Sequence, residues 1–196
     1  VATGTILTGK VSVADPLQIL PSGKETKARF LEVHHHRVDQ AIAGQRVGIN
    51  LHRVPIDDLR PGMVLASPAA LRPSYLLNAE LSLLPKTRKP VRDRQRIRLY
   101  VGTCVTNALL VLMEKQRINP GETGLVQLRM LEPLAVLPKD SFLISFMNVH
   151  GIVGGGAILE PTDEKYRAVK TSKIVPYLRC LHRGDVKSAT SIFFQR

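Results

Sequence analysis

Two glycines and a lysine near the start of the chain have the spacing of a phosphate-binding loop. Gly4, Gly9 and Lys10 satisfy G-x-x-x-x-G-K. Such a loop also needs Ser or Thr after the lysine, for magnesium, and a helix whose N–H groups face the phosphates. Here Val11 follows, and the β-branched residues before Pro16 disfavour a helix. The spacing therefore predicts no nucleotide site, and we expect no cofactor in this chain.

Three consecutive histidines, His34 to His36, raise the question of a metal site. Neighbouring side chains on a strand point to opposite faces, so the three cannot converge without a bend. No cysteine or carboxylate stands at the ligand spacing of a zinc site. We expect no metal here, but a strand end whose imidazoles face solvent or RNA.

The glycine-rich run from Gly151 to Gly156 superficially resembles a dinucleotide-binding fingerprint. The fingerprint requires a helix, and only four residues stand before Pro161. We expect a bulge or a close approach of two backbones instead. No nucleophile elbow or zinc-protease motif is present either, so the sequence does not favour a free-standing enzyme.

The densest cluster of charge covers residues 86–98, with seven basic residues and one acidic. Arginines alternate from Arg92 to Arg98, so a strand that began this early would project them from one face as a row for phosphates. A flexible basic loop remains the alternative. Aromatic residues make up only 5% of the chain, so base stacking is not the expected mode. The candidate RNA-binding residues are Lys86, Arg88, Lys89, Arg92, Arg94, Arg96 and Arg98.

The charge of the whole chain is uneven. The formal charge of +12 over 196 residues lies mainly in 86–98 and in 164–196. Positive patches of this kind predict a polyanionic partner, most simply RNA, and a solvated basic surface is the alternative. No apolar run is long enough to cross a membrane, and we expect no secretory signal. Two widely separated cysteines fit a reducing compartment, so we expect a cytoplasmic fragment of a longer protein.

The elements that must position these residues are mostly strands. Apolar residues recur with a period near two, turn signals separate them, and alternating helices are lacking, which predicts closed antiparallel barrels or sandwiches. We expect an all-β fold of two tandem barrels, 1–70 and 71–163, and a helical segment over 164–196 that is interrupted by Pro176. The predicted strands are Thr3–Thr8, Leu17–Leu20, Arg29–His34, Arg46–Leu51, Met63–Ala66, Leu76–Leu84, Ile97–Val101, Val105–Met113, Gly124–Leu131, Ser141–Phe146 and Gly156–Glu160.

Several motifs occur in a characteristic order over residues 1–163. They are Thr3-Gly4-Thr5 with Gly9, Val11 and Val13; Ile19–Gly23; Ala43-Gly44-Gln45-Arg46-Val47; Leu59–Ala66; Arg98–Thr103; Pro120–Arg129; Glu132–Val136; and Ile152–Pro161. In this order they resemble the second and third barrel domains of translational GTPases of the elongation factor Tu type. Within that group, the chain is most similar to bacterial selenocysteine-specific elongation factors. The segment after 163 resembles the start of the winged-helix extension of that family.

The resemblance implies a role in translation. In the family, the second domain, which corresponds to residues 1–70 here, holds the aminoacyl end of the tRNA. The third domain, which corresponds to residues 71–163, holds the acceptor and T arms. The arginine of the A-G-Q-R motif, here Arg46, lies near the selenol. GTP and magnesium belong to a preceding domain that this chain does not include, and the mRNA hairpin to later C-terminal domains. Family members usually carry Arg where Ser145 stands, so that contact is not expected here.

We therefore expect an RNA-binding module of a selenocysteine-specific elongation factor, which recognises selenocysteinyl-tRNA for delivery to the ribosome. Two alternatives remain open. One is the corresponding pair of barrels from another translational GTPase, either an ordinary aminoacyl-tRNA carrier or an initiation factor. The other is a barrel protein of the ribosome that binds ribosomal RNA.

Overall fold

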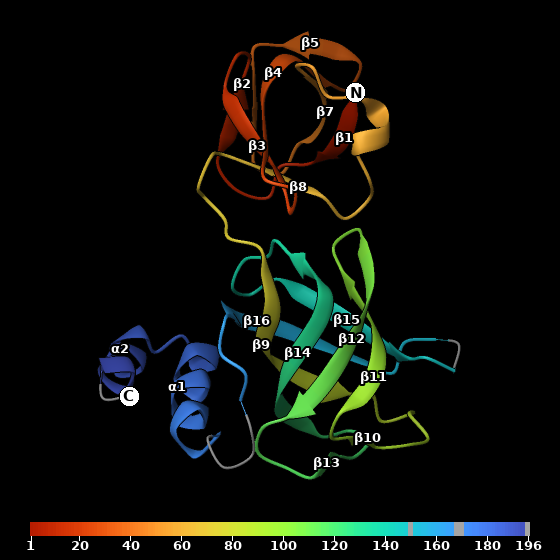
Figure 1. Ribbon diagram of the computed structural model, residues 1–196, viewed down its shortest axis with the longest axis vertical. Coiled ribbons are helices and arrows are strands. Elements are labelled where there is room, and N and C mark those ends of the chain that lie inside the picture. Colours follow the sequence, from red (N-terminus) through yellow and green to blue (C-terminus); the bar gives the residue numbers. More distant parts are fainter. Residues whose placement is uncertain (149–150, 167–170, 195–196) are drawn as a thin grey trace. The chain divides into compact units, whose positions relative to one another are not determined.

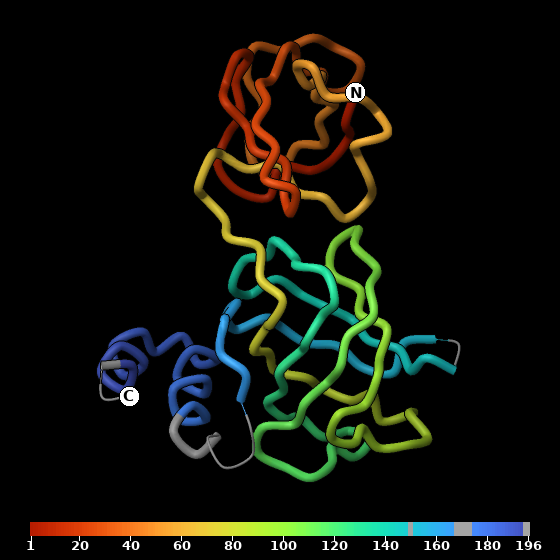
Figure 2. Tube along the Cα trace, viewed as in Figure 1, coloured from red at the N-terminus to blue at the C-terminus, as the bar shows by residue number. Residues whose placement is uncertain are grey.

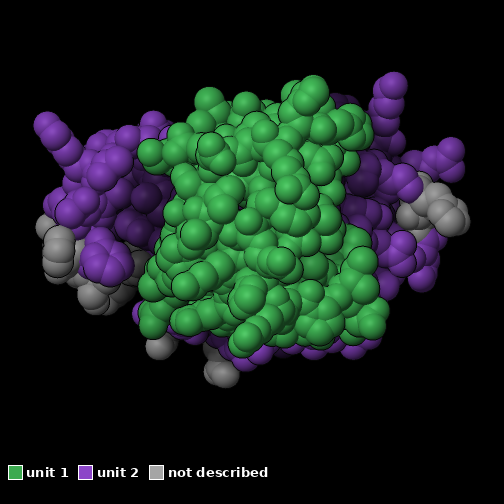
Figure 3. Space-filling model, turned by 90° about the horizontal axis from the view of Figure 1, so that it is seen from above, with its two compact units in different colours: residues 1–72 green, residues 73–196 purple. Residues whose placement is uncertain are grey.

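The computed structural model describes residues 1–148, 151–166 and 171–194, which form strands as far as Thr162 and two helices after it (Figure 1 and Figure 2). The chain divides into two compact units, residues 1–72 and 73–196, coloured separately in Figure 3. The expected all-β architecture with a short helical segment is confirmed.

Unit 1 encloses one apolar core between a curved sheet and a short ribbon. The sheet has the antiparallel order β1-β7-β4-β3-β8, with β5 paired to β4, and β2 and β6 form the ribbon. Val11 of β2 and Ala41 of β6 pack in the same buried cluster as Leu31 of β4 and Ile49 of β7, which makes the unit barrel-like. The strands are β1 (Ala2–Thr5), β2 (Lys10–Ser12), β3 (Pro16–Leu20), β4 (Lys24–Val33), β5 (His36–Val38), β6 (Gln40–Ile42), β7 (Arg46–Leu51) and β8 (Val64–Ala66), and a 3₁₀ turn covers Ile56–Asp58.

Unit 2 is built on a closed barrel of six strands, in the order β11-β12-β14-β9-β16-β15. Alternation along these strands sends Leu77, Leu99, Leu128 and Phe142 into one core, where each is almost completely buried. Two short strands, β10 and β13, form a separate pair beside the barrel (Figure 1). The elements are β9 (Ser74–Leu83), β10 (Val91–Arg92), β11 (Gln95–Val101), β12 (Cys104–Leu112), β13 (Arg117–Ile118), β14 (Thr123–Leu134), β15 (Ser141–Phe146), β16 (Gly154–Thr162), α1 (Thr171–Arg183) and α2 (Val186–Phe194).

Three consecutive glycines let β16 enter the barrel between β9 and β15. A Cβ atom on Gly154 would lie 2.6 Å from the carbonyl oxygen of Ser82, and one on Gly155 would lie 2.6 Å from that of Phe142. A Cβ on Gly156 would overlap the carbonyl oxygen of Glu80. The expected close approach of two backbones is therefore what the glycines provide, and no helix follows them.

The helices pack against the outer face of the second barrel. Tyr177 and Leu178 of α1 and Ala189 of α2 share a buried apolar cluster with Leu125 of β14 and Leu159 of β16. The sequence predicts a helical segment from Glu164 that is interrupted at Pro176. The interruption is wrong, because α1 begins at Thr171 and continues through Pro176 to Arg183, and residues 167–170 lie outside the described part. Neither of the two described helices is long and apolar enough to span a membrane.

A polar network lies beneath this helical segment. The amide of Asn78 donates to Glu160 Oε1 at 2.9 Å, and the amide of Gln127 donates to Asn78 Oδ1 at 3.1 Å. Gln127 also donates to the carbonyl of Glu164, and Arg129 donates to the carbonyl of Tyr166 at 2.6 Å. Asn78 and Gln127 are fully buried, so these hydrogen bonds satisfy groups that would otherwise be costly to bury.

Candidate nucleic-acid interface

Arg46 is the first residue of β7 and its side chain is exposed. A tight turn precedes it, in which Gly44 has a φ of 88° and the Gln45 side chain accepts a hydrogen bond from the Ile42 N–H at 2.8 Å. A left-handed φ of this kind suits glycine because it has no Cβ. The turn thus fixes where β7 starts and where the guanidinium leaves the barrel.

Hydrogen bonds join this turn to the loop that follows β1. The Ile6 N–H donates to the carbonyl of Gln45 at 3.0 Å, and the Gly44 N–H donates to the carbonyl of Ile6 at 2.8 Å. Thr5 pairs with Arg46 across β1 and β7. No ion pair involves Arg46 within the described ranges, so it presents a cation that the protein itself leaves unneutralised.

The structure also settles the conformation of the G-x-x-x-x-G-K segment. Gly4 lies in β1, Gly9 turns the chain with a φ of 72°, and Lys10 begins β2. The strands on either side pair with β7 and β6 and not with each other. A strand therefore stands where a phosphate-binding loop requires a helix.

The three histidines occupy the tip of the β4–β5 hairpin. His34 and His35 have φ values of 50° and 66°, as in a type I′ turn, and His36 begins β5 opposite Val33. All three are exposed, and the His35 imidazole lies 3.7 Å from Glu32. Within the described ranges, no group of three His, Cys, Asp or Glu side chains has the arrangement of a metal site.

The basic residues of 86–98 are divided among four parts of the backbone: the loop between β9 and β10, β10 itself, the turn after it, and β11. Lys86, Arg88 and Lys89 are exposed in the loop between β9 and β10. The Thr87 hydroxyl pins this loop by donating to the carbonyl of Val153 at 2.9 Å. The loop is therefore held against the barrel at one point, with its basic side chains outward.

The expected row of four arginines on one strand is wrong. A turn at Asp93 and Arg94, with a φ of 53° at Arg94, separates β10 from β11, so the strand does not begin early enough. Asp93 holds this turn because its carboxylate accepts a hydrogen bond from the Leu112 N–H at 2.9 Å. Only Arg96 and Arg98 share a face of β11, and both are exposed.

Arg98 lies beside a hydrogen-bonded pair. The strand register places it opposite Asn107 on β12 and opposite Ser145 on β15. The Tyr100 and Ser145 hydroxyl oxygens are 3.3 Å apart. This hydrogen bond, together with Arg98, holds the pKa of Tyr100 below its ordinary value. A serine at 145 thus keeps a neutral contact at the strand position next to Arg98.

Sequence reasoning missed Arg117, which the structure places directly opposite Arg92 in the β10–β13 pair. β10 and β13 have two residues each, which is too short to show an alternation of apolar residues, so the sequence pattern did not predict that they pair. The signal available was the Asn119-Pro120-Gly121-Glu122 turn, which marks where the chain reverses after Arg117. In that turn, hydrogen bonds from the Asn119 backbone and side chain lower the pKa of Glu122.

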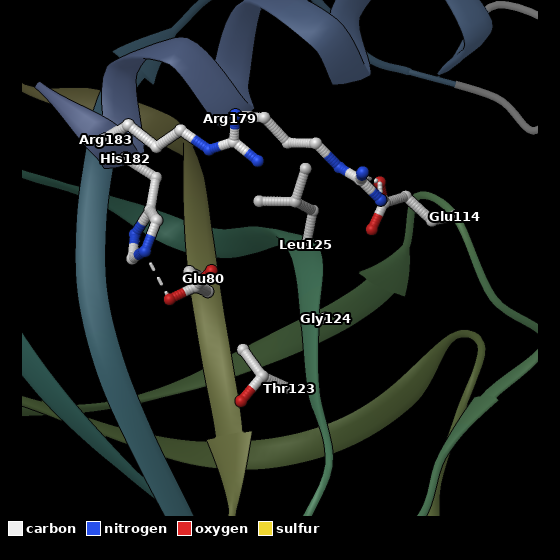
Figure 4. Close-up of a pocket in the computed structure, with 8 residues that line it drawn as sticks. All are labelled: Glu80, Glu114, Thr123, Gly124, Leu125, Arg179, His182 and Arg183. Atoms are coloured by element: carbon white, nitrogen blue, oxygen red, sulfur yellow. Dashed lines mark hydrogen bonds and ion pairs between the residues drawn. The ribbon is translucent and has the colours of Figure 1, made fainter. Parts of the chain in front are cut away.

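A cleft between α1 and the barrel combines both signs of charge (Figure 4). Arg179 pairs with Glu114 at 2.7 Å, and His182 Nδ1 lies 3.2 Å from Glu80 Oε2. Arg183 lines the same cleft. Because carboxylates face two of its three basic side chains, the cleft fastens α1 to the barrel and is a weaker candidate for RNA phosphates than the exposed arginines.

Comparison with known proteins agrees with the two barrels of the fold. Residues 1–66 match the family model of elongation factor Tu domain 2, and residues 78–165 match that of the selenocysteine-specific elongation factor beta-barrel domain. The selenocysteine-specific elongation factor of Desulfomicrobium baculatum is 31% identical over 167 residues. The chain belongs to the selenocysteine-specific elongation factor family.

The match covers 85% of this chain and 26% of the Desulfomicrobium baculatum relative, so the chain spans about a quarter of that protein's length. Both matched models are barrel domains, one in each unit. These 196 residues are thus the barrel region of a selenocysteine-specific elongation factor and not its GTPase domain.

Proposed function

We propose that this barrel region binds selenocysteinyl-tRNA for delivery to the ribosome in the cytoplasm, with Arg46 facing the selenol of the aminoacyl group. In the parent factor, a separate domain would bind GTP and magnesium, and further C-terminal domains would bind an mRNA hairpin. Membership of the selenocysteine-specific family supports the choice of tRNA. The exposed and unneutralised guanidinium of Arg46 is the observation that carries the proposal.

The chemistry of the selenol favours an arginine. A selenol is ionised at neutral pH, whereas the hydroxyl of serine stays neutral. A guanidinium is permanently charged and offers several donors in a fixed plane, so it suits a small anion held in one orientation. The turn that precedes Arg46 is hydrogen-bonded to the loop after β1, which limits the positions the side chain can reach.

The test compares two charged tRNAs on the full-length factor at one salt concentration. Arg46→Ala should weaken binding of selenocysteinyl-tRNA by roughly ten- to a hundredfold and leave seryl-tRNA nearly unchanged, as expected for loss of a charge-assisted contact. Arg46→Lys should recover part of the loss because it restores the charge without the planar donors.

Arg29 offers a matched control, since it is another exposed arginine on a strand of the same unit. Arg29→Ala should leave the preference for selenocysteinyl-tRNA intact. Equal losses for both tRNAs in the Arg46→Ala factor would assign Arg46 to the tRNA backbone or to the barrel, and would contradict the selenol role.

A further inference from the structure

The β10–β13 pair places two arginines side by side on the surface of the second barrel. Val91 lies opposite Ile118, and Arg92 lies opposite Arg117. Val91 and Ile118 are fully buried in the barrel core. Because successive side chains alternate between faces, burial of the first pair requires the second pair to face solvent. Both arginines are indeed exposed.

Packing on the inner face fixes this orientation. Ile118 sits so close to β14 that a Cβ atom on Gly124 would lie 2.9 Å from its Cδ1 atom. The Arg92 N–H donates to the Gln95 side chain at 2.9 Å, which anchors the other strand. The β10–β13 pair therefore fixes the face of the barrel from which both arginine side chains project.

The two guanidiniums carry charge that the protein leaves unbalanced. Like charges directly opposite one another on paired strands, with Cβ atoms about 5 Å apart, destabilise the pair. The carboxylates nearest in sequence have other partners. Asp93 accepts from the Leu112 N–H and lies 3.9 Å from Arg94, Glu114 pairs with Arg179, and Glu122 lies 3.5 Å from Lys115. Within the described ranges, no ion pair involves Arg92 or Arg117.

We propose that Arg92 and Arg117 form a clamp for one backbone phosphate of RNA, which makes Arg117 a binding residue in addition to the basic residues of 86–98. A phosphate between the guanidiniums would replace their repulsion with charge-assisted hydrogen bonds from both sides. The exposed basic loop of 86–89 leads into β10, so an RNA backbone bound at the clamp would continue over this loop. This inference rests on the proposed function, because it names how the same module contacts the RNA backbone.

The experiment measures binding of a 12-base-pair RNA hairpin without an aminoacyl group to the 196-residue chain between 50 and 200 mM KCl. Arg92→Gln and Arg117→Gln should each weaken binding roughly three- to tenfold. The double variant should lose less than the product of the two losses, because both residues act on one phosphate. Its salt slope should fall by about 0.7 to 0.9, the value for a single phosphate contact.

Lys139→Gln is the matched control, since Lys139 is an exposed cation on the β14–β15 connection of the same barrel, and its slope should not change. If the double variant lost the full product of the two single losses, and its salt slope fell by twice the single-contact value, Arg92 and Arg117 would bind two separate phosphates. That result would overturn the clamp. Unchanged binding in Arg117→Gln would overturn it as well.

A measurement without RNA adds an independent check. Relief of the repulsion predicts that Arg117→Gln raises the melting temperature at low salt, and that the difference shrinks as salt is added. A lower melting temperature at low salt would contradict the unbalanced charge on which the clamp depends. Since the hairpin has no aminoacyl group, these results are independent of Arg46. Equal losses of selenocysteinyl-tRNA and seryl-tRNA in the Arg46→Ala factor, with the clamp intact, would reject the proposed selenol role alone.

Discussion

The hydroxyl of Tyr177 donates a hydrogen bond of 2.8 Å to Glu160 Oε2, which joins α1 to β16. The other carboxylate oxygen of Glu160 accepts from Asn78 inside the polar network. The ring of Tyr177 also contacts Phe193 of α2, with ring centroids 5.9 Å apart. One side chain therefore links the barrel to both helices, by a polar contact at its tip and an apolar one along its ring.

Replacing Tyr177 with phenylalanine should separate these two contributions. Tyr177→Phe keeps the ring and leaves Glu160 without one of its donors, so we expect a loss of about 1–2 kcal/mol in the free energy of unfolding. Urea unfolding followed by circular dichroism measures the loss. Tyr75→Phe is the control, because Tyr75 is 54% exposed, and it should change stability little. Equal effects of the two variants would show that the hydroxyl of Tyr177 does not stabilise the docking of α1.

The glycine at 156 should not tolerate a side chain. Gly156→Ala would place a methyl group on the carbonyl oxygen of Glu80, so β16 and β9 would have to separate. We expect a destabilisation of about 1–3 kcal/mol or more, measured by thermal unfolding. Gly4→Ala, where nothing lies within 4 Å of the added atom, should be close to neutral. A neutral Gly156→Ala would mean that the strands can shift apart at little cost.

The stability of the first turn of α2 should depend on pH through the ionisation of Asp185. Its carboxylate accepts a hydrogen bond from the Ser188 N–H at 3.1 Å, in the manner of an N-cap, and hydrogen bonds from Ser188 lower the pKa of Asp185. Because the folded pKa is depressed, this contribution to stability is present above the pKa of the unfolded chain, near 4, and is lost as the pH falls through the folded value. Amide and Cα chemical shifts of residues 186–189 should follow that loss.

Asp185→Asn provides the comparison for this titration. Asparagine keeps an acceptor at the N-cap but does not ionise in this range, so the chemical shifts of residues 186–189 should become independent of pH. A titration that persisted in Asp185→Asn would assign the pH dependence to another group.

Guanine nucleotides should not bind to this chain. The Gly4–Lys10 segment lacks the hydroxyl after the lysine and the helix after the loop, and Lys10 belongs to a strand. Calorimetric titration of GTP or GDP with magnesium should give only heats of dilution, both for the natural chain and for Lys10→Ala. Micromolar binding that Lys10→Ala abolishes would show that the segment can rearrange into a phosphate-binding loop.

The fold could be predicted from the sequence where strands are long enough to show alternation. β7 and β15 have the predicted bounds, since buried and exposed residues alternate through Arg46–Leu51 and much of Ser141–Phe146. The strands of two or three residues, such as β10 and β13, have no readable period. Their existence depends on Val91 and Ile118 meeting in the core, which is a contact between segments far apart in the sequence.

The site was predicted less completely for a related reason. Arg94 occupies a left-handed conformation that glycine or asparagine usually signals, and a hydrogen bond from Leu112 to Asp93 stabilises this turn. Without knowledge of that hydrogen bond, the arginines of 92–98 resemble one continuous strand. The role expected of Arg46 came from the family resemblance alone, and its exposure at the start of β7 is a finding of the structure.

The closed circuit of the second barrel has a consequence for how its specificity can evolve. Each of its six strands has two neighbours, so the strands offer no free edge to which another chain could add a strand. A partner that docks on the wall of this barrel therefore meets outward side chains rather than the unpaired N–H and C=O groups of a strand edge. Single substitutions on that outer face can change what the barrel recognises while the strand pairing and the core stay as they are.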